Sequence, residues 1–299
     1  MKIEAGCVVG FVGTGVMGGA MAGHLMDAGY RLRVHNRTQE KAAHLIARGA
    51  VWCATAGEVA EGADAVVTIV GYPADVDRIY LGEGGLVPSA ARGTVLIDMT
   101  TSTPSLAIRI AEAAADMGVC ALDAPVSGGD VGARDAKLTI MVGGDPEAFA
   151  AVESLLRVMG PNVVLQGGPG CGQHTKMANQ IAIADTIVGV CESLAYAEAA
   201  GLEPARVLES IGAGSAGSWQ LANYAPRMLG GDFAPGFFVK HFIKDMRIAR
   251  DEAADMGVEL PGLLLALELF EELAAKGHED RGIHALYLLY RERVERARH

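Results

Sequence analysis

The chain has 299 residues, of which 51% are hydrophobic and 20% are charged, which disfavours disorder except at the ends and allows about two globular domains. Its formal net charge of -11 disfavours a nucleic-acid ligand, because binding to phosphate backbones needs a basic face. The five cysteines form no C-x-x-C pair and most lie in apolar runs, which is typical of a reducing compartment. With no secretory signal and no apolar stretch long enough for a membrane span, a cytoplasmic protein is expected.

The first half alternates strand and helix patterns. Apolar runs predict strands over residues 7–12, 30–35, 65–70, 95–98, 119–123 and 138–142. Helices are predicted over residues 17–27 and 39–47, after the Thr-rich cap 100–104, and after the N-cap Asp145 with proline at position 146. Such alternation predicts an α/β fold with a parallel sheet and right-handed crossovers.

The pattern changes at the glycine-rich run 167–172, which is expected to be a loop or hinge. Residues 173–200 then predict one apolar helix, about 42 Å long and buried nearly all round. Further helices are predicted over residues 204–211, 217–229, 239–256, 261–276 and 282–298. The expected organisation is therefore a Rossmann dinucleotide-binding domain over residues 1–166 and an all-helical domain for substrate binding and oligomerisation over residues 167–299.

A G-x-G-x-x-G fingerprint at Gly13, Gly15 and Gly18 follows the first strand and opens the first helix. The first glycine permits the tight turn, the second lets a pyrophosphate approach the backbone, and the third allows close helix–strand packing. The alternative is a glycine-rich turn without a ligand. The sequence predicts an NAD(P) site whose phosphates meet the helix N-terminus, with these contacts: Gly13, Thr14, Gly15, Val16 and Met17.

The end of the second strand bears on the choice between NAD and NADP. An acidic residue there binds the ribose 2′-hydroxyl of NAD, whereas an arginine accommodates the 2′-phosphate of NADP. This chain carries Asn36, Arg37 and Thr38 and no carboxylate at that point. Arg37 can bind the phosphate and its neighbours can donate hydrogen bonds, so NADP is favoured, with NAD as the alternative. The alternative interpretation of Arg37 is an ordinary exposed surface arginine.

Four motifs in order resemble the β-hydroxyacid dehydrogenases, a family that includes 3-hydroxyisobutyrate dehydrogenase and the tartronate, glyoxylate and succinic semialdehyde reductases. The motifs are GFVGTGVMG at 10–18, DAPVSGG at 123–129, GCGQHTKMAN at 170–179 and Lys244-Asp245. The resemblance runs nearly end to end. It implies a Rossmann domain followed by a helical domain, with the active site in the cleft between them.

The resemblance also implies roles for individual residues. Lys176 would be the catalytic lysine, and Ser127, Gly128 and Gly129 would hold a substrate carboxylate. Thr101 and Lys244 would lie near the nicotinamide half of the cofactor, and we count Val70 among the cofactor contacts. The family usually has two asparagines after the lysine; here they are Asn179 and Gln180, both expected to contact substrate. The longer Gln180 puts a direct transfer of substrate identity in doubt.

The residue chemistry agrees with these roles. Hydride transfer to a carbonyl requires a proton donor, and Lys176, at the start of the long helix, shares one helical face with Asn179 and Gln180. The alternative is an exposed surface lysine. No metal-ligand spacing is present, so no metal is expected. Lys240 is a weaker cofactor candidate. Trp219 and Phe242 are expected in the core, with lining of the substrate site as the alternative.

The expected reaction is oxidation of a small β-hydroxyacid or reduction of its semialdehyde. A related reductase acting on another acceptor, such as an imine, usually lacks the lysine, and a non-catalytic NADP-binding module would be expected to lose Lys176 or Ser127. The expected partner is a small carboxylate substrate, with no nucleic acid and no membrane. Apolar helices in the second half suggest a homodimer or homotetramer.

Overall fold

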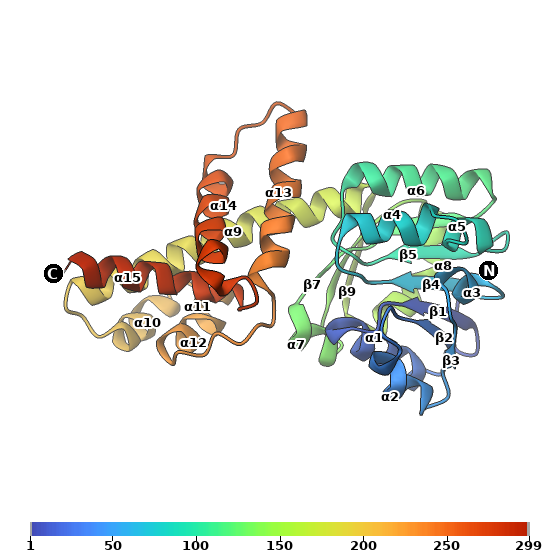
Figure 1. Ribbon diagram of the computed structural model, residues 1–299, viewed down its shortest axis with the longest axis horizontal. Coiled ribbons are helices and arrows are strands. Elements are labelled where there is room, and N and C mark those ends of the chain that lie inside the picture. Colours follow the sequence, from blue (N-terminus) through green and yellow to red (C-terminus); the bar gives the residue numbers. More distant parts are fainter. Residues whose placement is uncertain (1, 298–299) are drawn as a thin grey trace. The chain divides into compact units, whose positions relative to one another are not determined.

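The computed structural model describes residues 2–297, and the chain divides into two compact units, Met1–Lys176 and Met177–His299. The division falls within the long helix α9 (Cys171–Ala199), later than the boundary expected after residue 166. Figure 1 labels most of the helices and strands of both units.

Among the described residues, the first unit contains one nine-stranded sheet. In chain order its strands are β1 Val8–Val12, β2 Arg31–His35, β3 Val51–Trp52, β4 Ala65–Thr68, β5 Val95–Asp98, β6 Cys120–Asp123, β7 Val126–Ser127, β8 Thr139–Gly143 and β9 Asn162–Gly167. Their spatial order is β3-β2-β1-β4-β5-β6-β8-β7, with β9 paired to β8. Strands β1 to β6 are parallel, and β8 runs antiparallel to β6 and β7. The chain adds β2 and β3 on one side of β1 and then β4, β5 and β6 on the other, so the loop after β1 lies at the switch point of the sheet. This is the predicted Rossmann-like fold.

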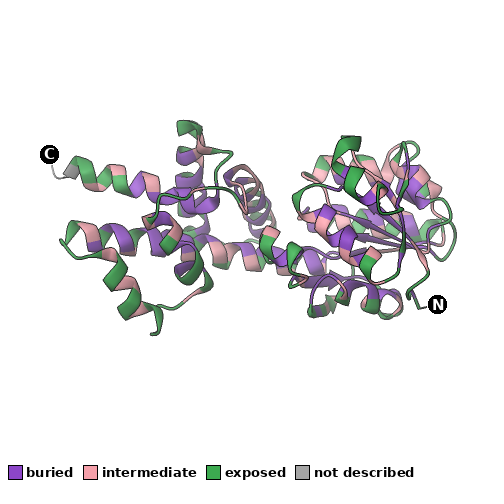
Figure 2. Ribbon diagram, turned by 90° about the horizontal axis from the view of Figure 1, so that it is seen from below, coloured by how far each residue is buried: buried purple, intermediate pink, exposed green. Residues whose placement is uncertain are grey.

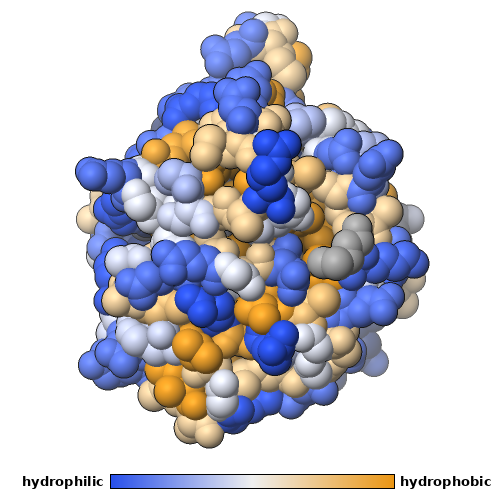
Figure 3. Space-filling model, turned by 90° about the vertical axis from the view of Figure 1, so that its right-hand side faces the viewer, coloured by the Kyte–Doolittle hydropathy of each residue, from blue (hydrophilic) through white to orange (hydrophobic). Residues whose placement is uncertain are grey.

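Helices cover both faces of this sheet. In chain order they are α1 Val16–Asp27, the 3₁₀ turn η1 Gln39–Ala42, α2 Ala43–Ile46, α3 Ala56–Ala60, α4 Pro73–Leu81, α5 Leu86–Ser89, α6 Pro104–Asp116, α7 Gly129–Arg134 and α8 Pro146–Arg157. Alternation along β4 shows the two layers: Ala65 and Val67 pack with α1, α2 and α8, whereas Val66 packs with α3 to α6. The central strands β4 and β5 are accordingly buried, as Figure 2 shows. On the face seen in Figure 3, hydrophilic side chains separate the apolar ones into small groups.

Several elements of the first unit were not predicted from the sequence. They are β3, α3, α4, α5, β7, α7 and β9. One of them, α3, carried a readable signal, because Thr55 and Glu58 have the spacing of a capping box. The Thr55 hydroxyl accepts from the Glu58 backbone N–H, and the Glu58 carboxylate accepts from the backbone N–H of Ala54, the residue before the N-cap. The predicted strand 65–70 ends earlier, at Thr68, because the chain turns into the loop above β4.

The second unit is all-helical, as predicted. Besides the larger part of α9 it contains α10 Pro204–Gly212, α11 Trp219–Asn223, α12 Ala225–Leu229, α13 Val239–Asp255, α14 Pro261–Leu273, the π-type turn η2 Ala274–His278, the 3₁₀ turn η3 Ile283–Leu286 and α15 Tyr287–Ala297. The predicted helix end at residue 298 lies outside the described residues. Phe242 is fully buried and packs edge-on against Phe270. Trp219, expected in the core, is instead 62% exposed.

Two expectations for the long helix are wrong. The helix begins at Cys171, so the end of the predicted glycine loop is helical. It is also not buried all round, because one stripe is exposed along its length: His174, Ala178, Ala182, Asp185, Gly189, Glu192 and Tyr196. The stripe contains the polar His174, Asp185 and Glu192 beside small residues that tolerate solvent, which explains the error. By length and composition α9 could cross a membrane, but half of its most apolar window is buried inside the protein, as in the core helix of a folded domain.

Candidate active site

The loop after β1 needs glycine at two positions for steric reasons. Gly13 has a φ of +98°, and a Cβ there would lie 2.0 Å from the carbonyl oxygen of Ile69. A Cβ on Gly18 would lie 1.9 Å from the carbonyl oxygen of Gly13. The loop between β1 and α1 is therefore as tight as the fingerprint predicts.

The start of α1 fits a pyrophosphate group. Gly15 is the N-cap, no side chain caps the helix, and its first turn contains no acidic residue. A Cβ on Gly15 would meet nothing within 4 Å, and Val16 is 74% exposed. The hydroxyl of Thr14 is buried without a hydrogen-bond partner among the described residues. Uncapped N–H groups at the positive end of a helix, next to open space, are what an anionic cofactor group requires.

The end of β2 is tied to this loop. The Asn36 side-chain oxygen accepts from the Thr14 backbone N–H at 3.1 Å, and its amide nitrogen donates to the Thr38 carbonyl at 2.8 Å. The Asn36 side chain is thus hydrogen-bonded to the backbone of Thr14 and Thr38, whereas the sequence predicted that it would donate to a phosphate. Arg37 is exposed and makes no ion pair within residues 2–297.

A buried polar network lies where β4 and β5 end. The Thr68 hydroxyl contacts the Tyr80 hydroxyl at 2.8 Å and donates to the Asp98 carboxylate at 3.0 Å. The same carboxylate oxygen accepts from the Thr100 backbone N–H at 3.0 Å, and the Thr100 hydroxyl accepts from the Val70 backbone N–H at 3.0 Å. Burial raises the pKa of Asp98 to about 6, with hydrogen bonds from Thr100 and Thr68 opposing the rise. Asp98 therefore anchors the loops that carry Val70 and Thr101.

Lys176 is buried beside the segment expected to bind a carboxylate. Its side chain is 6% exposed, and its Nζ donates to the Val126 carbonyl at 2.8 Å. Val126 directly precedes Ser127 in β7. Gly128 and Gly129 follow with φ angles of +133° and +64°, which favour glycine. The exposed-surface interpretation of Lys176 is wrong, and the lysine lies next to the Ser127 segment within the first unit.

A second network of charged and amide groups lies inside the second unit. Gln180 is fully buried; it accepts from the Asn179 amide at 2.8 Å and donates to Asp245 at 2.6 Å. Asp245 also pairs with Lys244, the two charged atoms being 3.0 Å apart. Gln180 thus uses its amide within the protein, whereas Asn179 is half-buried. Lys240, the weaker cofactor candidate, pairs with Asp280.

Two buried carboxylates in the first unit were missed from the sequence. Asp98 and Asp123 end neighbouring strands and lie side by side in the β5–β6 register. Burial raises the pKa of Asp123, opposed by hydrogen bonds from backbone N–H groups of Gly170 and Gln173. The signal was a carboxylate at the carboxyl end of each predicted strand, where ligand sites of parallel sheets form.

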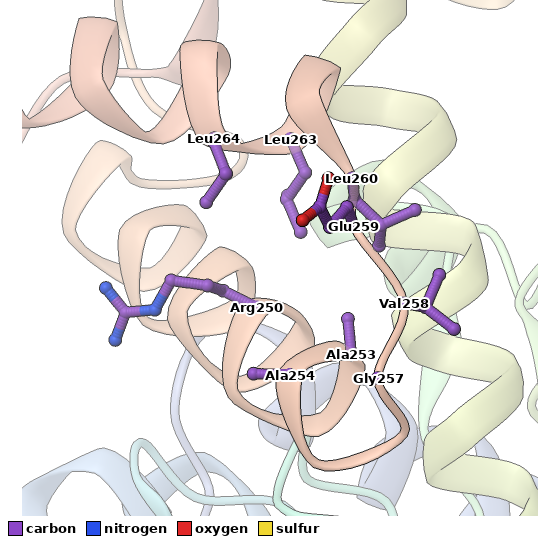
Figure 4. A pocket seen from close by; sticks show the side chains of 9 residues that line it. All are labelled: Arg250, Ala253, Ala254, Gly257, Val258, Glu259, Leu260, Leu263 and Leu264. Carbon is purple, nitrogen blue, oxygen red and sulfur yellow. The ribbon is translucent and has the colours of Figure 1, made fainter.

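A pocket of about 360 Å³ lies elsewhere, where α13 ends and α14 begins. Figure 4 shows leucine, valine and alanine side chains around it, with Arg250 extending away from the leucines. None of the predicted site residues lines this pocket, so its apolar walls carry no part of the expected chemistry.

Comparison with known families agrees with this geometry. Residues 8–168 match the NAD-binding domain of 6-phosphogluconate dehydrogenase, and residues 170–290 match the NAD-binding domain of NADP-dependent 3-hydroxyisobutyrate dehydrogenase. The chain belongs to the β-hydroxyacid dehydrogenase family. It is therefore an NAD(P)-binding oxidoreductase that acts on CH–OH groups.

Individual members of the β-hydroxyacid dehydrogenase family resemble the chain along nearly its whole length. The uncharacterized oxidoreductase YkwC of Bacillus subtilis is 54% identical over 94% of this chain and 98% of its own. The 2-hydroxy-3-oxopropionate reductase of Escherichia coli is 38% identical over 90% of this chain and 92% of its own. The Mycobacterium tuberculosis 3-hydroxyisobutyrate dehydrogenase, solved with L-serine, has a TM-score of 0.88 and 28% identity, covering 97% of this chain and 100% of its own.

Proposed function

We propose that this enzyme interconverts a small β-hydroxyacid and the matching semialdehyde, with Lys176 as general acid and base. The supporting observation is the buried Lys176 amine bonded to the Val126 carbonyl, one residue before Ser127. A lysine in that setting is shielded from bulk water and lies near the segment that we propose to bind the substrate carboxylate. 3-Hydroxyisobutyrate is the substrate type favoured by the family.

The nicotinamide cofactor, when bound, supplies the hydride for reduction and accepts it in oxidation. Gly13 to Met17 would hold its pyrophosphate, and Val70, Thr101 and Lys244 would contact its nicotinamide half. In reduction Lys176 donates a proton to the carbonyl oxygen, and in oxidation the neutral amine takes the hydroxyl proton. A cationic amine also stabilises the negative charge that grows on that oxygen.

The substrate carboxylate would be held by Ser127, Gly128 and Gly129. Consecutive backbone N–H groups and a hydroxyl can together cup a carboxylate. Asn179 and Gln180 would complete the substrate contacts, and of the two the half-buried Asn179 has the more accessible amide. This arrangement selects a short acid whose reacting carbon lies close to its carboxylate.

We also propose a preference for NADP, carried by Arg37 with Asn36 and Thr38. Support comes from the exposed, unpaired guanidinium of Arg37 within the described chain and from the missing carboxylate at the end of β2. NAD is the alternative cofactor.

The test is a spectrophotometric assay at 340 nm, where reduced nicotinamide absorbs, with both cofactors. The substrate panel holds 3-hydroxyisobutyrate, succinic semialdehyde, glyoxylate and tartronate semialdehyde. We expect turnover by the wild type and a loss of at least about 100-fold in kcat for Lys176→Ala, with cofactor affinity kept. Turnover retained by Lys176→Ala would remove the lysine from the mechanism.

A second candidate is a tartronate semialdehyde reductase. It is favoured by the 38% identity to the reductase of 2-hydroxy-3-oxopropionate, which is the same compound. The panel separates the two candidates by kcat/KM, since each predicts a different preferred substrate.

We further propose a homodimer or homotetramer in the cytoplasm. Large apolar side chains are exposed on the second unit: Tyr196, Leu202, Trp219, Met256, Val258, Leu264 and Leu265. All five cysteines are free thiols, as a reducing compartment requires. Light scattering after size exclusion tests the assembly, where a monomer would contradict it, and cell fractionation tests the compartment.

A further inference from the structure

Gln173 connects the start of α9 to the loop after β5. Its side chain is fully buried. The amide nitrogen donates to the Thr100 carbonyl at 2.7 Å, and the amide oxygen accepts from the Ser102 backbone N–H at 3.0 Å. These two bonds lie on either side of Thr101, so the side-chain amide pairs with this loop as a neighbouring strand would.

The backbone of Gln173 is held as well. Its N–H donates to one oxygen of Asp123 at 2.8 Å, and the Gly170 N–H donates to the other at 2.8 Å. On the adjoining residue, a Cβ on Gly172 would lie 2.5 Å from the Met141 carbonyl oxygen. The first turn of α9 is therefore fixed against β6 and β8 with little freedom to rotate or shift.

Lys176 follows Gln173 by three residues, so the two side chains share one side of the helix. The helix turn that carries the lysine is thus bonded directly to the loop that carries Thr101. We propose that Gln173 is a positioning residue, which sets the Lys176 amine relative to the Thr101 loop. This inference rests on the proposed function, in which Lys176 exchanges the proton and Thr101 lies at the nicotinamide.

The size of the effect follows from the sensitivity of catalysis to geometry. A misplacement of about 1 Å in a reacting group can cost about 100-fold in rate. Gln173→Met has nearly the same volume but makes neither loop bond. We therefore expect kcat to fall by about 10- to 100-fold, while KM and the cofactor dissociation constant stay within about threefold.

The pH dependence of kcat in Gln173→Glu separates a positioning role from a merely structural one, because a structural role predicts no such dependence. An ionised carboxylate still accepts from Ser102 but faces the Thr100 carbonyl without a proton to donate. Protonation restores the donor, so kcat of this variant relative to wild type should recover as pH falls. A constant ratio across pH 5 to 9 would overturn the positioning role.

Thr94→Val is the matched control. The Thr94 hydroxyl is buried in the same unit and donates to the Ala63 carbonyl at 3.1 Å, just before β5 begins. The variant removes one buried bond at the opposite end of that strand, so the melting temperature should fall while kcat stays unchanged. An equal loss of kcat in this control would show that general destabilisation explains the Gln173 variants.

A second measurement does not depend on turnover. Lys176 is 6% exposed, so an amine-reactive reagent should label it slowly, as followed by mass spectrometry of its peptide. In Gln173→Met the labelling rate should rise several-fold, and an unchanged rate together with unchanged kcat overturns the inference. If the wild type turns over no substrate of the panel, the proposed function fails, and the labelling rate alone then decides whether Gln173 positions the lysine.

Discussion

Asp98→Asn should raise the free energy of unfolding relative to that of the wild type, and this difference should grow as pH rises. Folding buries this carboxyl group and raises its pKa from 3.8 to about 6. Between these values the folded state binds more protons than the unfolded state, so the free energy of unfolding of the wild type falls as pH increases. At 1.36 kcal/mol per pH unit, the fall amounts to about 3 kcal/mol across this window.

Asparagine removes this dependence and keeps the hydrogen bonds. Its side-chain oxygen can accept from the Thr68 hydroxyl and the Thr100 N–H, as one oxygen of Asp98 does. Relative to the wild type, Asp98→Asn should therefore gain about 3 kcal/mol in unfolding free energy between pH 4 and pH 7.

Urea unfolding at several pH values, followed by circular dichroism, measures this difference. Because the chain forms two compact units, hydrogen exchange of the β5 amides should be followed as well, to report on the first unit alone. A constant stability difference between the two proteins from pH 4 to pH 7 would refute the assignment of a buried, protonatable Asp98.

Three further substitutions separate packing, cofactor contact and substrate contact. Gly15→Ala should leave the melting temperature unchanged but weaken NADPH binding at least about 10-fold, because the added Cβ meets only the open space proposed for the pyrophosphate. Gly18→Ala should lower the free energy of unfolding by about 1–3 kcal/mol, because the added Cβ clashes with the backbone. Equal melting temperatures for the two variants would contradict this steric account. Arg37→Ala should raise KM for NADPH at least about 10-fold and leave KM for NADH nearly unchanged, as loss of a charge-assisted phosphate contact implies; equal changes would refute the NADP preference. Gln180→Asn shortens the side chain that reaches Asp245 and should change the kcat/KM ranking of the substrate panel; an unchanged ranking would show that this position does not shape the pocket.

Local sequence signals were sufficient to predict much of the fold of this protein and the position of its dinucleotide loop. The spacing of the glycines at 13, 15 and 18 predicts the dinucleotide loop. Gly13 has a positive φ and Gly18 leaves no room for a Cβ, whereas Gly15 borders open space. Alternating strand and helix patterns likewise predict the Rossmann-like sheet and the all-helical second unit, since periodicity depends only on neighbouring residues. Lys176 is recognised by its position in a motif, and its burial agrees with a role beyond the surface.

The partners of the buried polar groups depend on contacts between segments that are far apart in the sequence. The sequence does not show that Gln173 bonds on either side of Thr101, or that Asp98 and Asp123 become neighbours, because β5 and β6 must first pair in register. The sequence also overstated the burial of α9, because which face of the helix stays exposed depends on the elements that pack against it. Periodicity and glycine patterns are properties of the local chain, whereas the partner of a buried polar group is chosen only when distant segments pack together.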